Sequence, residues 1–506
     1  MKLLGIDVGT GGTRALVVDE RGSILASATA EHEPFLSPQT GWAEQDARDW
    51  WRATIEAVRK VLAHPDIVAD DIACVGFSGQ MHGAVLLDES GEVLRPALIW
   101  CDQRTDEQCR DITERIGAER LIELTSNPAL TNFTLTKLLW VREREPEVWS
   151  RFRSLLLPKD YVRFQLTNDR AIDVADASGT LLLDVANRRW SDAMLDALEI
   201  DRRCLPSLFE SQEITGRVSA AGAEATGLRQ GTPVVAGAGD QAAGAVGMGI
   251  VRPGAVSATI GTSGVVFAAT DRPALDKRGR VHTFCHAVPG RWHVMGVTQA
   301  AGLSLRWFRD RFGVGEASGE KAAEKRDPYD LLSEEAETAP PGSDGVLWAP
   351  YLMGERTPHL DPHARAALVG LAASHTRAHV VRAIMEGVAF SLRDTLTIFA
   401  EMDVPVETIR LGGGGARSRV WRQIQADVYG RAVEILAAEE GAAYGAALLA
   451  GVGSGLWRSV DEACAQAVRV DTVVEPDASA AALMNRSYAA YRALYPALRS
   501  IAETVG

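Results

Sequence analysis

The alternation of apolar and polar positions at the start of the chain predicts two strands joined by a tight turn. Residues 3–8 and 15–18 are mostly apolar, and the turn between them is rich in Gly and Thr. The same pattern returns at residues 256–260 and 265–267, again around a turn of Gly, Thr and Ser. Glycine in such a turn can adopt positive φ and lets the backbone approach a ligand closely. The repeat therefore predicts two hairpins in a duplicated chain.

Helical periods alternate with strand signals along the rest of the chain. Apolar residues recur at helical spacing over 51–62 and over 376–401. A strand at 408–411, the glycine loop GGGGAR at 412–417 and another helix follow. Strand, glycine loop and helix together are typical of nucleotide binding, because bare backbone and a helix N-terminus can face phosphate. Residues 315–345, rich in Glu, Lys, Ala and Pro, predict an exposed helix and loop, and the whole pattern predicts a mixed-sheet α/β fold.

A Gly/Ala-rich stretch at residues 227–254 marks the predicted boundary between two domains. It fits a strand, a sharp turn at Gly239 and Asp240, and a helix of small residues, and the second hairpin follows directly. We therefore expect an N-terminal domain over 1–249 and a C-terminal domain over 250–506.

Composition narrows the classes of function. The chain has 506 residues, 46% of them hydrophobic and 24% charged, which suits a protein with more than one globular core. Lys and Arg total 53 against 67 Asp and Glu, which gives a net charge of −14. This charge disfavours nucleic acid or an anionic membrane as the main partner. Six scattered cysteines without metal-binding spacing, and an N-terminus without a signal-peptide pattern, predict a cytoplasmic location.

The two hairpins carry candidate phosphate chemistry. Their exposed N–H groups and hydroxyls suggest that both grip one polyphosphate. Asp7 stands near the end of an apolar strand, where a buried carboxylate needs compensation, and this favours a site for Mg²⁺ and phosphate. The alternative is that both are ordinary hairpins whose glycines serve only the turn. Neither is a P-loop or a GxGxxG motif, so a dinucleotide-binding domain fits poorly.

Several motifs, in order along the chain, resemble the FGGY carbohydrate kinases. They are DVGTGGTR at 7–14, FTLTKLLWV at 133–141, GDQAAGAVG at 239–247, GTSG at 261–264, ALVGLAASHTRAHVVRAIMEG at 367–387 and the glycine loop at 412–415. The resemblance implies an α/β fold of two duplicated ribonuclease-H-like domains, of the actin/hexokinase superfamily, with a cleft between them. It also implies ATP-dependent phosphorylation of a carbohydrate, with Mg²⁺ near Asp7.

Two further motifs bear on the substrate. SGQMHG and YLMGERTPHLDPHAR resemble family members that phosphorylate D-xylulose to D-xylulose 5-phosphate. By that resemblance, Met81 and His82 contact the ketose. Such members commonly have Asn after the catalytic Asp, whereas Asp240 is followed here by Gln241. Another ketose or polyol, such as ribulose, L-xylulose, a sugar alcohol or glycerol, is therefore an alternative substrate.

The expected site residues follow from these motifs. Asp240 is the candidate general base for the terminal C5 hydroxyl of the ketose, Asp7 is the second catalytic carboxylate, and both are candidate metal ligands. Without the motifs, Asp240 would fit a helix cap at a turn. The expected substrate-binding set is Met81, His82, Asp240 and Gln241. The expected nucleotide-binding set is Gly9, Thr10, Gly11, Thr13, Arg14, Gly261, Thr262, Ser263, Gly413 and Gly414.

One other class of protein shares part of this pattern. An actin-like or Hsp70-like ATPase would have the hairpins, but it needs no small-polyol site, and SGQMHG and GDQAAG argue against it. The expected partners are ATP and a small ketose or polyol, with neither nucleic acid nor a membrane. Self-association as a homodimer is left open.

Overall fold

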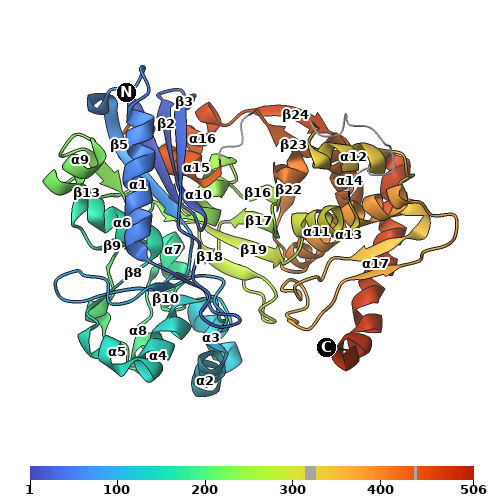
Figure 1. Cartoon of the computed structure of the whole chain (residues 1–506), viewed down its shortest axis with the longest axis horizontal. Helices are drawn as coiled ribbons and strands as arrows, with labels where there is room; N and C mark the ends of the chain where they lie inside the picture. Colours follow the sequence, from blue (N-terminus) through green and yellow to red (C-terminus); the bar gives the residue numbers. More distant parts are fainter. Residues whose placement is uncertain (314–325, 438–440, 506) are drawn as a thin grey trace.

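The chain folds into two bodies that lie side by side, each built around one mixed sheet with helices against it (Figure 1). The structure is a computed structural model and describes residues 1–313, 326–437 and 441–505. In that part of the chain, no helix is both long enough and apolar enough to cross a lipid bilayer.

The first sheet takes its strands from the N-terminal half of the chain. Its order is β13-β14-β5-β1-β2-β3, and β15 pairs with the end of β5. The strands are β1 (Lys2–Val8), β2 (Gly12–Asp19), β3 (Ile24–Glu31), β5 (Ile72–Gly79), β13 (Ile214–Arg217), β14 (Pro233–Val235) and β15 (Ala238–Gly239). β1 and β2 pair antiparallel from Lys2↔Asp19 to Val8↔Thr13, which confirms the first predicted hairpin.

The second sheet takes its strands from the C-terminal half. Its order is β18-β19-β17-β16-β22-β23-β24. The strands are β16 (Gly254–Ile260), β17 (Gly264–Thr270), β18 (His282–Cys285), β19 (Trp292–Thr298), β22 (Val406–Gly413), β23 (Val433–Leu436) and β24 (Val470–Val474). β16 and β17 form the second predicted hairpin.

The two sheets share one strand pattern. In each, the first strand of the hairpin runs parallel to a later strand, β5 in one sheet and β22 in the other. That strand is parallel in turn to β14 or β23, and an antiparallel edge strand, β13 or β24, completes this side. On the other side, β3 or β19 pairs antiparallel with the second hairpin strand. This repetition confirms the predicted duplication within an α/β fold.

Short ribbons decorate the two sheets. They pair β4 (Glu44–Gln45) with β7 (Ala97–Leu98), β6 (Val85–Leu87) with β8 (Ser154–Leu156), β9 (Ala171–Asp173) with β12 (Ser207–Phe209), β10 (Leu183–Asp184) with β11 (Arg189–Trp190), and β20 (Leu347–Ala349) with β21 (Ala367–Val369).

Helices cover the sheets and form the lower part of the first body in Figure 1. Those of the N-terminal half are α1 (Ala47–Leu62), α2 (Asp106–Ile116), α3 (Ala118–Thr125), α4 (Thr134–Arg144), α5 (Pro146–Arg151), α6 (Pro158–Thr167), α7 (Val174–Ser178), α8 (Asp192–Leu198), α9 (Ala220–Thr226) and α10 (Asp240–Gly247). Those of the C-terminal half are α11 (Gly302–Phe312), α12 (Pro328–Glu337), α13 (Arg377–Glu401), α14 (Arg419–Tyr429), α15 (Gly441–Gly453), α16 (Val460–Ala467) and α17 (Ala478–Val505).

Helix α15 comes from the C-terminal half of the chain but packs on the first sheet. Glycines make this close approach possible. A Cβ added to Gly5 of β1 or Gly76 of β5 would lie 1.9 Å from a backbone oxygen of α15, that of Ala443 or Ala446. α15 also packs against α10, where a Cβ on Gly445 would lie 1.8 Å from the Ala243 oxygen. Small residues on both sides are therefore a packing requirement here.

Two local predictions can be compared with the helices. The expected helix over 376–401 is confirmed as α13, and Thr376 caps it with a reciprocal bond to His379. In the expected exposed segment 315–345, residues 314–325 lie outside the described part of the chain. The remainder contains α12, which is only partly exposed, because its Leu332 and Ala336 are buried in the core of the second body.

Candidate active site

The carboxyl ends of three parallel strands bring the predicted catalytic carboxylates to one edge of the first sheet. β1 and β15 both run parallel to β5, with Asp7 and Ala238 each paired to Ser78. Asp7 is the penultimate residue of β1, and Asp240 follows β15 as the first residue of α10. Parallel neighbours end at the same edge of a sheet, where ligands of open α/β folds bind, so the two carboxylates lie close together.

Burial and mutual repulsion shift both carboxyl groups. The pKa of Asp240 is raised to about 7, first by burial and then by the charge of Asp7, against hydrogen bonds from the backbone and side chain of Gln241. Burial also raises the pKa of Asp7, against the Ser78 hydroxyl and the positive charge of Arg14. Oδ1 of Asp7 is buried and accepts no hydrogen bond within the described chain. A cation would stabilise this oxygen.

The carboxylate pair fits Mg²⁺ better than a metal with an all-protein ligand set. Within the described ranges, no cluster of three or more His, Cys, Asp or Glu side chains could hold a metal ion. Mg²⁺ needs none, because it usually binds through one or two carboxylates, waters and substrate phosphates. The unpartnered Oδ1 of Asp7 beside Asp240 matches that requirement.

The tip of the first hairpin is braced by side chains that sequence reasoning missed. Nε2 of Gln45 donates to the Thr10 carbonyl at 2.8 Å, and Nε1 of Trp100 donates to the Thr10 hydroxyl at 2.9 Å. Nε2 of Gln80 donates to the Gly9 carbonyl at 3.3 Å. These contacts come from the protein itself, so its own side chains fix the shape of the tip.

Two details of the first hairpin differ from expectation. The Thr13 hydroxyl, expected to face phosphate, is buried 2.9 Å from Nε2 of His32, since this side chain of β2 points into the body. Gly11 and Gly12 do not use positive φ. Gly12 is required for space instead, because a Cβ there would lie 2.7 Å from the Ala30 oxygen.

A cavity of about 350 Å³ lies beside the second hairpin, in the second body. Its lining joins the hairpin, the glycine loop, α11 and the start of α12, and includes Gly261, Thr262, Gly302, Arg306, Asp327, Tyr329, Gly414, Gly415 and Ser418. The N–H groups of Gly302 and Leu303 donate to the Gly261 and Thr262 carbonyls, at 2.8 and 3.1 Å, and so tie α11 to the hairpin. Gly413 has φ +72°, and a Cβ there would lie 2.4 Å from the Ile260 oxygen. Only glycine at position 413 therefore allows the loop to lie this close to the hairpin backbone.

Met81 lies next to the turn that carries Asp240, and His82 lies next to the end of α7. A Cβ added to Gly239 would lie 2.7 Å from Cγ of Met81, and one added to Gly179 would lie 2.6 Å from Nδ1 of His82. Met81 therefore packs against the backbone that positions the predicted base, whereas His82 packs against the end of α7.

The protonation of His82 follows from its contacts. Its Nδ1 lies 2.8 Å from the Gly179 carbonyl oxygen, which only accepts, so Nδ1 carries the proton. Burial, followed by the charge of Lys137, lowers the pKa of His82 to about 3, and the charge of Arg356 adds to this effect. The ring is neutral at pH 7, and its Nε2 is an acceptor suited to a sugar hydroxyl.

Aromatic side chains from both bodies surround His82. Its ring meets Phe133 of the first body edge-on, with centroids 5.2 Å apart, and Phe284 of β18 at 6.2 Å. His282 stacks on Phe284, and its Nδ1 lies 3.1 Å from Oδ1 of Asn127 in the first body. β18 of the second sheet therefore packs against His82 and the first body.

Comparison with known proteins identifies the family. Residues 2–247 match the N-terminal domain of the FGGY family of carbohydrate kinases, and residues 256–454 match its C-terminal domain. The chain belongs to the FGGY family of carbohydrate kinases. As a member it is a phosphotransferase whose acceptor is a hydroxyl group, and this confirms the resemblance carried by the motifs.

Similar proteins span the whole FGGY kinase chain. The xylulose kinase of Bacillus subtilis is 39% identical over 493 residues, which cover 97% of this chain and 96% of that protein. The gluconokinase of the same organism is 33% identical over 453 residues, 88% of this chain and 86% of its own. A crystal structure described as a xyloylose kinase from Brucella ovis matches with a TM-score of 0.90 and 35% identity, over 99% of this chain and 100% of that one.

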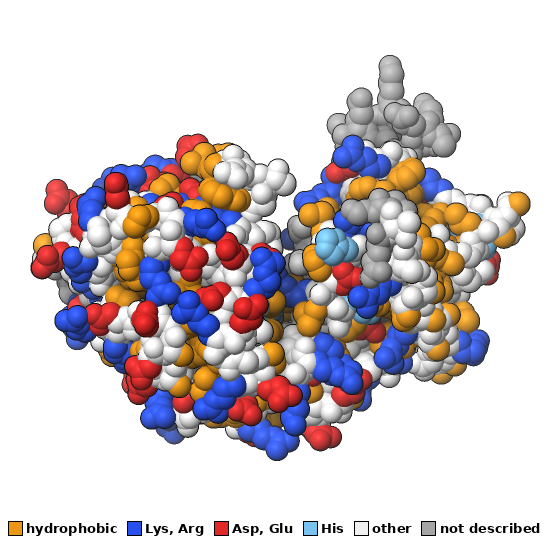
Figure 2. Space-filling model, turned by 90° about the horizontal axis from the view of Figure 1, so that it is seen from below, with side chains coloured by type: hydrophobic (Ala, Val, Ile, Leu, Met, Phe, Trp, Pro, Cys, Tyr) orange, Lys and Arg blue, Asp and Glu red, His pale blue; other side chains and the backbone are white. Residues whose placement is uncertain are grey.

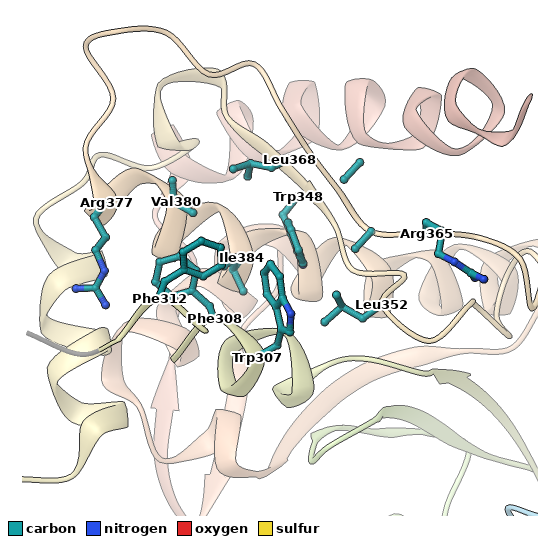
Figure 3. A pocket seen from close by; sticks show the side chains of 12 residues that line it. Trp307, Phe308, Phe312, Trp348, Leu352, Arg365, Leu368, Arg377, Val380 and Ile384 are labelled. Atoms are coloured by element: carbon teal, nitrogen blue, oxygen red, sulfur yellow. The ribbon is translucent and has the colours of Figure 1, made fainter. Parts of the chain in front are cut away.

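The FGGY kinase has a second, larger cavity apart from these residues. This cavity is separate from the hollow that the surface shows between the two bodies (Figure 2). It has a volume of about 740 Å³ and lies within the second body, on α11, α13 and β20–β21. Its walls are mostly apolar, with Trp307, Phe308, Trp348 and Ile384 around it and Arg365 and Arg377 at its ends (Figure 3). None of the predicted site residues lines it.

Two cationic residues near His82 carried no predicted role, although both stand in quoted motifs. Lys137 belongs to FTLTKLLWV, and Arg356 belongs to YLMGERTPHLDPHAR. Both act electrostatically on His82. The sequence does carry a signal for Lys137, because a lysine inside a mostly apolar motif is seldom buried without a role.

Proposed function

We propose that this FGGY kinase transfers the γ-phosphoryl group of ATP to the terminal C5 hydroxyl of D-xylulose, giving D-xylulose 5-phosphate and ADP. The observation that carries the proposal is the placement of Asp240. It stands at the end of three parallel strands beside Asp7, its pKa is raised to about 7, and its turn packs against Met81. Such a carboxylate can take a proton at neutral pH from a hydroxyl bound over Met81 and His82.

The sugar is held by the first body. Nε2 of neutral His82 accepts a hydrogen bond from a ketose hydroxyl, and Met81 provides an apolar floor. Gln241 bonds to the Asp240 carboxylate and so orients it. With the acceptor oxygen fixed next to Asp240, this carboxylate receives the hydroxyl proton while the oxygen attacks the γ-phosphorus in line.

The phosphates are held by the two hairpin tips. Thr10 and the backbone of Gly9 and Gly11 serve on one side, and Gly261, Thr262 and Ser263 serve on the other. Arg14 adds positive charge near Asp7. Asp7 and Asp240 would hold Mg²⁺, which would neutralise phosphate charge when bound.

The nucleoside lies in the 350 Å³ cavity of the second body. Gly414 and Gly415 offer bare backbone to the base, and Gly413 holds their loop against the hairpin, while α11 and α12 close the other walls. In this proposal residues 1–249 bind the sugar and residues 250–506 bind the nucleotide. Six free cysteines and the use of ATP suit the cytoplasm.

The test is an acceptor panel in which ATP consumption is measured as ADP release and the position of the phosphate in the product is determined by NMR. We expect D-xylulose to have the highest kcat/KM among D-xylulose, D-ribulose, L-xylulose, xylitol, glycerol and D-gluconate. The similar gluconokinase and Gln241 in place of Asn favour another acceptor as the second candidate. A different acceptor in first place would replace D-xylulose, and ADP release indifferent to every acceptor would contradict the kinase itself.

A further inference from the structure

The backbone of His82 is held in a conformation that its own residue type disfavours. His82 has φ +69°, in the left-handed region where a Cβ crowds the following carbonyl. Such conformations persist only where the surroundings enforce them, and they cluster at functional sites. The question is which contacts enforce this one.

Two donors of one helix converge on the His82 carbonyl. Nζ of Lys137 donates to it at 3.0 Å, and Oγ1 of Thr134 donates to it at 3.2 Å. Both residues belong to the first turn of α4, three positions apart, and therefore share a helix face. Lys137 also donates to the Asn132 carbonyl at 2.5 Å, which fixes the ammonium group from behind.

Lys137 is an unusual group to bury for this purpose. It is 0% exposed, and within the described chain it forms no ion pair and donates only to carbonyl oxygens. The other fully buried lysine, Lys159, has carboxylates of Asp160 and Asp173 at 2.6 and 2.7 Å. Burial lowers the pKa of Lys137 to about 7. An apolar side chain of the same length would avoid this cost, so stability alone does not account for a lysine here.

We infer that Lys137 is a positioning residue: it clamps the His82 carbonyl and so holds His82 in the left-handed conformation that aims its imidazole at the acceptor sugar. The clamp works together with the bond from Nδ1 of His82 to the Gly179 carbonyl, 2.8 Å away. With its carbonyl and its Nδ1 both fixed, the ring has one orientation, and Nε2 is the atom left to meet a substrate. This inference rests on the proposed function, because it assigns the clamp to the sugar side of that site.

The consequence is specific to acceptor binding. Without the clamp, His82 can relax toward negative φ, which swings its ring away from Gly179. The sugar then loses one hydrogen bond, whereas the hairpins and the nucleotide cavity are untouched. Lys137→Met keeps the length of the side chain and removes the donor. We expect it to raise the KM for D-xylulose about tenfold, with the KM for ATP unchanged within about twofold.

A double-mutant cycle separates positioning from general stability. If Lys137 acts through His82, Lys137→Met will raise KM no further in a His82→Ala background. Thr134→Val, which removes the weaker donor, should raise the KM for D-xylulose about threefold and show the same coupling. Thr136→Val is the matched control, because Thr136 is equally buried on α4 but donates to the Phe133 carbonyl at 2.8 Å. Its KM should stay at the wild-type value.

The outcomes distinguish the two proposals. Three results would overturn the clamp. They are multiplicative effects of Lys137→Met and His82→Ala on the KM for D-xylulose, a Lys137→Met variant whose KM for D-xylulose is unchanged, and a Lys137→Met variant whose KM for ATP rises equally. If Lys137→Met does not fold, the Thr134→Val and Thr136→Val pair decides by the same criteria. If the wild type prefers another acceptor, the proposed substrate is wrong, and the cycle is run with that acceptor and decides on the clamp independently.

Discussion

Asp240→Asn tests the centre of the proposed mechanism. The substitution keeps the size of the side chain and the first turn of α10 but removes the proton acceptor. A positioned general base contributes a factor of about 10² to 10⁴ to the rate, which corresponds to about 3 to 5 kcal/mol of transition-state stabilisation. We therefore expect kcat to fall at least about a hundredfold, while ATP still binds.

The raised pKa of Asp240 adds a signature in pH. Below a pKa of about 7 the carboxyl group is protonated and cannot accept the sugar proton, so log kcat/KM of the wild type should rise with unit slope up to about pH 7. The residual activity of Asp240→Asn should lack this limb. A side chain that only capped the helix would produce neither the rate loss nor the change in profile.

Stability gives the control against misfolding. Because the folded pKa of Asp240 lies above the ordinary value of 3.8, the folded state between these two pKa values retains a proton that the unfolded state has lost. The protonated carboxyl group therefore favours the folded state over the ionised one. This contribution to stability is fully present below about pH 3.8 and is lost as the pH rises through about 7. The ionised carboxylate beside Asp7 then costs at most about 4 kcal/mol, a cost that Asn does not carry. At pH 8 the Tm of Asp240→Asn should therefore equal or exceed that of the wild type.

The assay couples ADP release to NADH oxidation at saturating D-xylulose, with ATP affinity measured by calorimetry and Tm by circular dichroism. More than about a tenth of wild-type kcat in a folded variant would refute the role of Asp240, because the loss would fall below that of a general base. A lowered Tm together with lost ATP binding would instead show that the variant fails to fold.

Three other substitutions test separate parts of the structure. His82→Ala removes the Nε2 acceptor, which costs about 1 to 3 kcal/mol of sugar binding, so the KM for D-xylulose should rise with little change in the KM for ATP. A KM for D-xylulose that is unchanged in steady-state kinetics would show that His82 does not bind the sugar. Gly413→Ala puts a Cβ 2.4 Å from the Ile260 oxygen at φ +72°, so it should weaken ATP binding in calorimetry and spare the sugar, whereas wild-type ATP affinity would contradict a nucleotide role for the glycine loop. Gly76→Ala puts a Cβ 1.9 Å from the Ala446 oxygen and should destabilise the fold by about 3 kcal/mol or more in denaturant titration; an unchanged midpoint would show that α15 does not pack tightly on the first sheet.

Some parts of the candidate site can be identified from sequence motifs and their order, and others only from contacts in the folded chain. The hairpins, the glycine loop and the turn at Asp240 are local features, since each depends on a few consecutive residues, and their order along the chain was enough to name a family. The brace of the first hairpin was not accessible in this way. Gln45, Gln80 and Trp100 reach it from three separate segments, and nothing in their own neighbourhoods marks them as a set.

The sequence by itself determined the local elements and the duplication, because apolar periodicity and glycine turns act over short stretches of chain. Only the tertiary structure decided which surfaces those elements share. It laid α15 on the sheet of the other half, turned the Thr13 hydroxyl toward His32, and brought Lys137 to the His82 carbonyl. It also raised the pKa of Asp240, since burial and the distance to Asp7 are properties of the packed chain. These effects depend on proximity in space and on exclusion of water, and neither is written in residue spacing.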